Sequence, residues 1–276
     1  MPCTHQRLTT PGFSNPIMLC PRLCFALWLF ANLILQPFDA SAAELRLRII
    51  YDGDPPVPKP IVVNKDKEFC GELKLIDERL LVNPENRGIQ NVVVYLYTGR
   101  GGTKIPAVPP RNQEVELTAE GCRLTSRIVV AQSGDTLVFS QKGVVAHNLN
   151  INFFSNPAMS RGGPLRATQR YHLARPEPAP IPMECNIHPW MKGYLVLLEH
   201  PYVGVSDANG QIVIEGLPDN SELLFRVFHE AIKVPHLSVR SDGADTIWER
   251  RFFSVTTTDG VTDLGPLLLK PTAFSH

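Results

Sequence analysis

Three side chains that bind soft metals lie within one short segment of the sequence. The segment reads Cys185-Asn-Ile-His188-Pro-Trp-Met191, which is a Cys-x2-His-x2-Met spacing. A thiolate, an imidazole and a thioether are sulfur and nitrogen ligands of the kind that copper takes, whereas zinc prefers further thiolates or a water molecule. The segment therefore predicts a copper site that needs another ligand from elsewhere in the chain.

His147 is the best candidate for that further ligand. The segment 147–153 reads His-Asn-Leu-Asn-Ile-Asn-Phe, so the odd positions are His147 and apolar residues while the even positions are all asparagine. Residues alternate between the two faces of a strand, and the apolar face must point into the core. His147 is therefore predicted to point inward. A buried imidazole needs a polar partner, and a metal ion would supply one.

The expected chain path brings these ligands together. We expect Cys185 to end a strand and His188 to lie in a tight loop that Pro189 makes rigid. Met191 then opens a strand that runs to Leu198. A trigonal Cys/His/His site with a weak axial Met is the arrangement of blue copper proteins. A scaffold that holds one geometry for both Cu(I) and Cu(II) lowers the reorganisation that electron transfer requires.

These residues resemble the copper site of the cupredoxins, especially of the plastocyanin and amicyanin branch. The resemblance depends on the pair His147-Asn148 and on the segment 185–191, in which proline follows the histidine. It implies that Asn148 braces the ligand loops by hydrogen bonds. It also implies one type 1 copper ion with three equatorial ligands and one axial ligand, namely His147, Cys185, His188 and Met191.

Composition and residue patterns indicate an all-β globular protein. The chain has 276 residues, of which 43% are hydrophobic and 20% are charged, and its formal net charge is +0. This is an ordinary globular composition, and it argues against a nucleic-acid partner, which requires a basic surface. The 25 prolines favour turns and short strands. Runs rich in β-branched and aromatic residues predict strands at 90–97, 126–130, 136–140 and 194–198.

The first part of the chain is predicted to be a signal peptide, residues 1–42. Arg22 precedes the apolar run 24–35, and the small residues 40–42 follow it as a cleavage site. The run is shorter than the roughly 20 residues that span a bilayer, and an uncut N-terminal anchor is the alternative. We therefore expect an exported protein of the bacterial periplasm or extracellular space, without a transmembrane span in the mature chain.

Two further parts are expected after the signal peptide. The resemblance implies that residues 43–200 form a cupredoxin-like Greek-key barrel or sandwich that binds the copper. Hairpin signals, such as Asp-Ala-Asn-Gly at 207–210, predict a C-terminal β-sandwich-like extension over residues 201–276, either as a small module of its own or as edge strands added to the main sandwich. The proline-rich segment 155–184 is expected to be a long connection, and connections of this length are often functional.

Three cysteines remain after the signal peptide, and their odd number is informative. An odd count in an exported protein suggests one disulfide and one cysteine with another role. Cys70 and Cys122 both lie in polar segments, at 68–71 and 120–123, so a disulfide between them is predicted. Two free thiols are the alternative, which an oxidising compartment disfavours.

The function that these features predict is an exported carrier of single electrons. Electrons would pass through an exposed edge of His188 to a soluble or membrane-attached redox protein, such as a cytochrome or a dehydrogenase. Trp190 is expected either to form part of an apolar docking patch around that edge or to pack beneath the loop. No hydrolase, nucleotide-binding or metalloprotease motif occurs at a usable position, so an enzyme is not predicted.

Two other functions remain open from the sequence. The chain could be a non-redox β-sandwich binding module in which copper is structural or lost, with segment 155–184 as the contact surface. A copper enzyme is disfavoured, because such enzymes need further histidine clusters and the remaining histidines are scattered along the chain.

Overall fold

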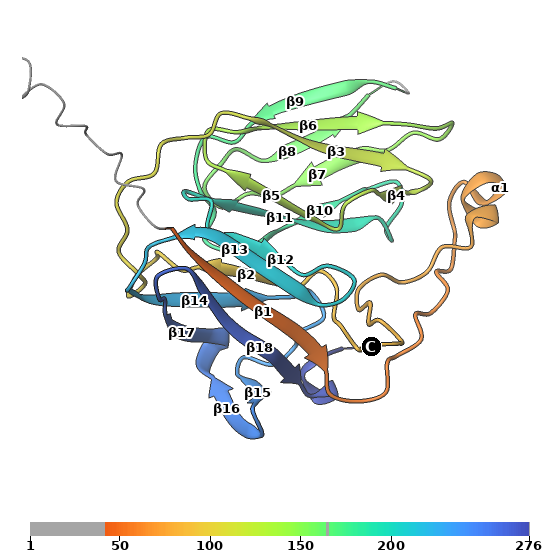
Figure 1. The fold of residues 1–276 in the computed structure, drawn as a ribbon. Coiled ribbons are helices and arrows are strands. Elements are labelled where there is room, and N and C mark those ends of the chain that lie inside the picture. The colour runs from red at the N-terminus through yellow and green to blue at the C-terminus, as the bar shows by residue number, and fades with distance from the viewer. Residues whose placement is uncertain (1–41, 164–165, 276) are drawn as a thin grey trace, which may run out of the picture. The chain divides into compact units, whose positions relative to one another are not determined.

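The computed structural model describes residues 42–163 and 166–275. The predicted signal peptide therefore lies outside the described residues, apart from Ala42. Within the described part the prediction of an all-β protein is confirmed, because strands arranged in four sheets form nearly all of the regular structure (Figure 1). No helix among these residues has the length and apolar character needed to cross a membrane.

The first sandwich, residues 114–198, consists of two sheets (Figure 1). In spatial order, one sheet contains β4 (Arg123–Leu124), β3 (Glu114–Glu120), β6 (Thr136–Gln141) and β9 (Thr168–His172), and the other contains β5 (Ile128–Gln132), β11 (Lys192–Leu198), β10 (Ile181–Glu184), β7 (Asn148–Ile151) and β8 (Met159–Gly162). One buried apolar cluster holds both sheets together, with Phe139 of β6 and Ile151 of β7 fully buried in it. The alternating burial along β7 is what a strand with one face on a core produces.

The second sandwich also consists of two sheets with a shared core. In spatial order, one sheet contains β13 (Gln211–Leu217), β1 (Ala43–Tyr51), β18 (Val261–Leu269), β15 (Leu237–Ser241) and β16 (Ala244–Trp248). The other sheet contains β12 (Val203–Val205), β2 (Val93–Leu96), β14 (Glu222–Phe228) and β17 (Phe252–Thr256). Its core includes the stacked rings of Trp248 and Phe253 and the fully buried Phe225.

The strand pairing divides the chain differently from the expected boundary at residue 200. β1 pairs with β13 and with β18, and β2 pairs with β12 and with β14, so both early strands hydrogen-bond to strands that follow residue 200. The first sandwich thus lies, in sequence, between β2 and β12 of the second. Burial explains the arrangement. β1 is 9 residues long and largely buried, so the backbone N–H and C=O groups along both of its edges must pair with neighbouring strands.

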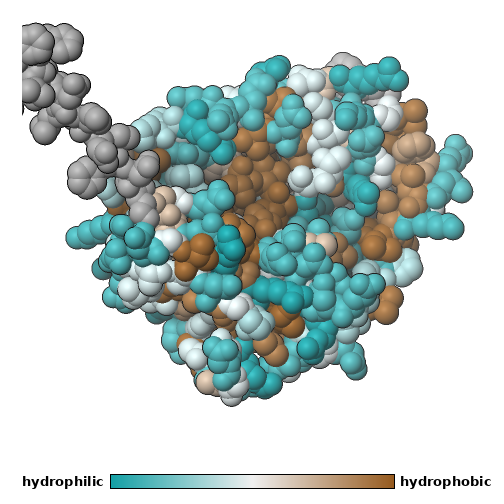
Figure 2. Space-filling view, in the orientation of Figure 1, coloured by the Kyte–Doolittle hydropathy of each residue, from teal (hydrophilic) through white to brown (hydrophobic). Residues whose placement is uncertain are grey.

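The two sandwiches contact each other through apolar residues and one buried ion pair. Val93 and Tyr95 of β2 form a small cluster with Val196 of β11. Beside it, the guanidinium of Arg127 donates to both carboxylate oxygens of Glu230. Both of these side chains are almost completely buried. On the face seen in Figure 2, hydrophilic residues surround a patch of hydrophobic residues near the centre.

Two connections differ from simple loops. The segment 155–184 is not one long connection, because it contains β8, β9 and β10; the expectation of an irregular loop was wrong there. Before β2, the chain forms the short helix α1 (Lys67–Cys70), followed by a 3-10 turn at Gly71–Leu73. A further 3-10 turn lies after β18, at Pro271–Ala273. Another 3-10 turn, at Glu249–Arg251, leads into β17.

Candidate metal centre

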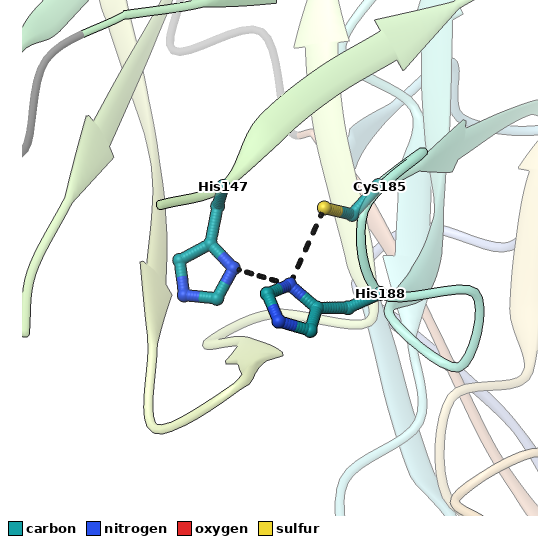
Figure 3. A group of neighbouring side chains, drawn as sticks. All are labelled: His147, Cys185 and His188. Atoms are coloured by element: carbon teal, nitrogen blue, oxygen red, sulfur yellow. Dashed lines mark hydrogen bonds between the residues drawn. The ribbon is translucent and has the colours of Figure 1, made fainter. Parts of the chain in front are cut away.

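Strand pairing brings His147 and Cys185 to the same end of the first sandwich. His147 directly precedes β7, and Cys185 directly follows β10. These strands are antiparallel neighbours, with Glu184 opposite Asn150. The start of one strand therefore lies beside the end of the other, and both side chains point toward His188 (Figure 3).

The predicted alternation along β7 is confirmed. His147 is 1% exposed, and Leu149 and Ile151 on the same face are fully buried. The intervening Asn148 and Asn150 are only partly buried. The backbone N–H of His147 donates to the side-chain oxygen of Gln141 at 2.8 Å, which fixes the residue at the start of the strand.

The loop that carries the other predicted ligands is closed by two backbone hydrogen bonds. The N–H of Met191 donates to the carbonyl of His188 at 2.9 Å, and the N–H of Cys185 donates to the carbonyl of Met191 at 3.1 Å. These bonds hold the cysteine, the histidine and the methionine in one tight turn between β10 and β11. The Met191 side chain is buried in the same apolar core as Cys185.

Three potential ligand atoms converge inside this turn. Nδ1 of His147 lies 3.0 Å from Nδ1 of His188, and Sγ of Cys185 lies 3.8 Å from the same His188 atom (Figure 3). The three ligand atoms all lie within 4.8 Å of one another, and all three residues are buried. Metal bonds of about 2.0–2.1 Å to nitrogen and about 2.3 Å to sulfur separate neighbouring ligand atoms by about 3.4–3.8 Å. The Cys185–His188 distance matches this spacing, whereas the two nitrogens lie closer together, so the cluster would have to open slightly to hold a single transition-metal ion.

The protonation of His147 suits a metal ligand. Burial, followed by the neighbouring His188, lowers the pKa of His147 to about 4, so its imidazole is neutral at neutral pH. Its other ring nitrogen, Nε2, is buried and has no hydrogen-bond partner among the described residues. A neutral imidazole whose Nδ1 faces a second imidazole and a thiol can offer a lone pair to a cation rather than carry charge itself.

Asn148 has the bracing position that the cupredoxin resemblance implies. Its side-chain oxygen accepts a hydrogen bond from the backbone N–H of Asn186 at 2.8 Å and lies 3.4 Å from Sγ of Cys185. It thus links the start of β7 to the loop that follows β10. Pro189 lies exposed in that loop, directly after His188.

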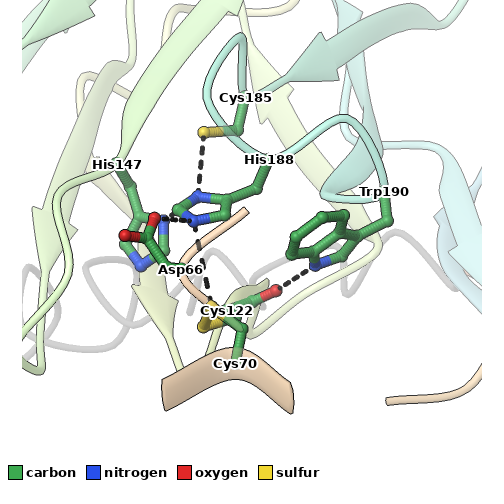
Figure 4. Close-up of a disulfide and its surroundings, with 7 residues drawn as sticks. All are labelled: Asp66, Cys70, Cys122, His147, Cys185, His188 and Trp190. Carbon is green, nitrogen blue, oxygen red and sulfur yellow. Dashed lines mark hydrogen bonds and ion pairs between the residues drawn. A yellow bond between two sulfur atoms is a disulfide. The ribbon is translucent and has the colours of Figure 1, made fainter. Parts of the chain in front are cut away.

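The expected exposed edge of His188 is wrong. The side chain is 0% exposed, because a distant segment covers it. Nε2 of His188 lies 2.8 Å from a carboxylate oxygen of Asp66 and 3.8 Å from Sγ of Cys70 (Figure 4). Cys70 forms the predicted disulfide with Cys122, and this bond holds α1 against the turn between β3 and β4.

Trp190 lies on the other side of His188 and is half-buried. Its ring centroid is 5.2 Å from that of the histidine, and its indole N–H donates to the carbonyl of Cys122 at 2.9 Å. The ring also packs against the core of the first sandwich, as the packing interpretation expects. Next to it lies a cavity of about 610 Å³, whose lining includes Trp190, Met191, Leu124 and Ile76.

Sequence reasoning missed Asp66 altogether. The residue is 122 positions from His188, and nothing in its neighbourhood of the sequence marks it as part of a metal site. The one available signal was the predicted disulfide, because Cys70 lies one helical turn after Asp66. Only knowledge of the fold could have shown that this disulfide lies beside the ligand loop.

Comparison with known proteins finds similarity to copper proteins among solved structures. No protein-family model matches the sequence, and no curated protein matches it. A mutant form of amicyanin with Cu(I) aligns at 13% identity over 30% of this chain and 81% of its own, with a TM-score of 0.28. Amicyanin from Paracoccus versutus aligns at 15% identity over 38% of this chain and 96% of its own, with a TM-score of 0.27.

A larger copper protein is also similar in part. The copper-containing nitrite reductase from Thermus scotoductus SA-01 aligns at 18% identity, with a TM-score of 0.27; the alignment covers 37% of this chain and 25% of the reductase. At TM-scores this low, none of these similarities bears on the function of the chain. The case for a metal depends on the donor set itself.

Proposed function

We propose that this protein binds one copper ion and carries single electrons. The equatorial ligands would be His147 and His188, each through Nδ1, and Cys185 through Sγ, with Met191 as the weak axial ligand. The observation that carries the proposal is the pair of Nδ1 atoms 3.0 Å apart beside a buried free thiol. Two imidazole nitrogens and a thiol that converge in this way are the donor set of a trigonal copper site.

The donor set favours copper over zinc. A structural zinc site usually has four strong ligands, and a catalytic one has three plus an open position for water. Here the three strong ligands are buried, and the fourth proposed ligand, Met191, is a thioether, which suits copper in a blue site. Bound copper would supply a Cu(I)/Cu(II) couple; the chain supplies a fixed, dry ligand cage.

Rigidity of that cage is the chain's contribution to electron transfer. The two backbone hydrogen bonds of the ligand loop, the Asn148 brace and the paired strands β7 and β10 all restrain the ligands. A cage that keeps its geometry in both oxidation states requires little rearrangement during transfer. The same rigidity argues against a substrate that must enter and bind to the metal directly.

The remaining parts of the proposal concern the location of the protein, its partner and its domain organisation. We propose export with residues 1–42 as the signal peptide, to the periplasm or the extracellular space, and a redox protein such as a cytochrome or a dehydrogenase as the partner. The copper domain would be centred on the first sandwich, within residues 43–200. Residues 201–276 would then supply most strands of the second sandwich as an extension.

The competing interpretation is a non-redox binding module. In that case the second sandwich would serve attachment, and copper would be structural or lost. The two interpretations differ in one property, which is reversible copper redox chemistry at the His147 site.

The test is a visible absorption spectrum combined with voltammetry. Mature protein with one equivalent of Cu(II) should show an intense thiolate-to-copper band that ascorbate bleaches, and a reversible one-electron couple on an electrode. Zinc should compete for the site without colour. A protein that binds copper without such a band or couple would favour the binding module, and one that binds none would refute the copper site.

A further inference from the structure

Two residues of a segment far from the metal motif contact His188 at the same ring nitrogen. Asp66 lies immediately before α1, and Cys70 ends that helix. The disulfide from Cys70 to Cys122 places both residues against the imidazole (Figure 4). We name residues 66–70 the cap. The cap meets the ring at Nε2, the nitrogen that faces away from Cys185 and His147.

The two histidines of the site differ in what their outer nitrogen contacts. His188 has the Asp66 carboxylate at 2.8 Å from Nε2. His147 has no such partner, because its Nε2 is buried and without a hydrogen bond among the described residues. Histidines that bind metals almost always donate their outer N–H to a carboxylate, a carbonyl or water, which fixes the tautomer and the ring orientation.

We propose that Asp66 is a positioning residue for the copper site. Its carboxylate accepts a hydrogen bond from Nε2–H of His188, and this leaves Nδ1 without a proton and directed at Cys185 and His147. The proposal depends on the proposed function, because the ring is positioned for a metal. It adds a residue that belongs to neither the ligand loop nor β7.

The backbone around Asp66 keeps the carboxylate in place. Asp66 has φ 46 and ψ 45, in the left-handed region, which Asp tolerates better than most residues. Its carbonyl accepts hydrogen bonds from the N–H groups of Phe69 at 3.0 Å and Cys70 at 2.8 Å. The disulfide then ties this turn to Cys122, whose carbonyl also accepts from Trp190.

The cap also places a negative charge beside one ligand. The Asp66 side chain is 42% exposed, so water can solvate it as a carboxylate while His188 is completely buried. A nearby negative charge stabilises Cu(II) more than Cu(I), because the oxidised ion carries more positive charge. Removing that charge should therefore raise the reduction potential.

The test compares Asp66→Asn and Asp66→Ala with Asp54→Asn, an exposed aspartate in the same connection. The first measurement uses ¹⁵N NMR of the imidazole rings in metal-free protein. Wild type and Asp66→Asn should keep the proton of His188 on Nε2, because the asparagine oxygen still accepts it. Asp66→Ala should show a mixture of tautomers, and thiol titration should show that the disulfide is intact in each variant.

The second measurement is the reduction potential of the copper-loaded proteins. Both Asp66 variants should have higher potentials than wild type, by about 59 mV for each tenfold loss of Cu(II) binding relative to Cu(I). Asp54→Asn should match wild type. The inference is refuted if wild-type His188 carries its proton on Nδ1, or if the potentials of both Asp66 variants are unchanged. Failure of wild type to bind copper would refute the proposed function instead, and the NMR result would still decide whether Asp66 holds the ring.

Discussion

Buried histidines in the two sandwiches show what separates a structural imidazole from a candidate ligand. His229, beside the second sandwich, is 2% exposed. Its Nε2–H donates to the carbonyl of Gln90 at 3.2 Å, and its Nδ1 accepts from the N–H of Ala231 at 3.2 Å. In the first sandwich, the Nδ1 atoms of His147 and His188 face each other instead. Backbone groups satisfy both ring nitrogens of His229, whereas one nitrogen of His147 and one of His188 converge with the sulfur of Cys185.

Burial and pKa do not make this distinction. The pKa of His229 is lowered to about 4 by burial, and that of His147 is also lowered to about 4 with burial as the largest cause. Both rings are therefore neutral at neutral pH. The difference lies in the hydrogen-bond partners, so the comparison predicts opposite consequences for changes in the two regions.

Cys185→Ser should have the largest effect on the site. Loss of the thiolate removes one of the three proposed strong ligands, so the thiolate-to-copper band should disappear. Copper affinity should fall by more than about 100-fold, which exceeds the usual effect of a residue that only contacts a ligand. Absorption spectra during copper titration measure both. His229→Gln, as the control from the other region, should keep the band; if it loses the band as well, the comparison fails.

Loss of the disulfide should have the next largest effect, this time on stability. The bond joins residues 52 positions apart, and closing such a loop stabilises a fold by about 4 kcal/mol in the chain-entropy model. Urea unfolding of Cys70→Ser/Cys122→Ser should show a loss of this order.

The same double variant should expose His188 but not His229. Modification by diethyl pyrocarbonate should become faster at His188 alone, because only that ring is covered by the cap. Equal reactivity of His188 in wild type and variant would contradict the role of the cap.

Acid should destabilise the second sandwich through His229. The pKa of His229 is about 4 in the folded protein and near 6.5 in an unfolded chain, so the unfolded state binds the proton first. The contribution of the neutral ring is complete above about pH 6.5 and is lost as the pH falls to about 4. At 1.36 kcal/mol per unit, the loss is about 3 kcal/mol.

The variant His229→Gln separates the contribution of His229 to the pH dependence from that of other histidines. Burial also lowers the pKa values of His147 and His200, so they contribute to the same acid dependence. Free energies of unfolding at pH 7 and pH 4 should differ less for His229→Gln than for wild type. An unchanged pH dependence would mean that His229 is not held neutral by the fold.

Asn148→Ala should have the smallest effect of these changes. Its side chain braces Cys185 and Asn186 without being a ligand, and residues in such positions typically change metal affinity by about 10–100-fold. Asn150→Ala, two residues along the same face of β7, should leave the affinity unchanged. Equal losses in both variants would indicate a general effect on the strand.

The sequence was sufficient for the local features of the site. Cys-x2-His-x2-Met places three donors in one turn, and the alternation around His147 predicted its burial, because both depend on short-range geometry. The strands β8 and β9 were missed because they are polar and short, with few β-branched residues. The pairing of β1 with β18 and the Asp66 contact join distant segments, and no local pattern records such contacts.

The most direct test of the proposed copper site is a crystal structure of the copper-loaded protein with anomalous data at the copper edge. We expect one strong peak bonded to Nδ1 of His147, Nδ1 of His188 and Sγ of Cys185, with Met191 nearby. A copper ion bound elsewhere, or a closed His147–Cys185–His188 cluster with no peak under saturating copper, would contradict this expectation.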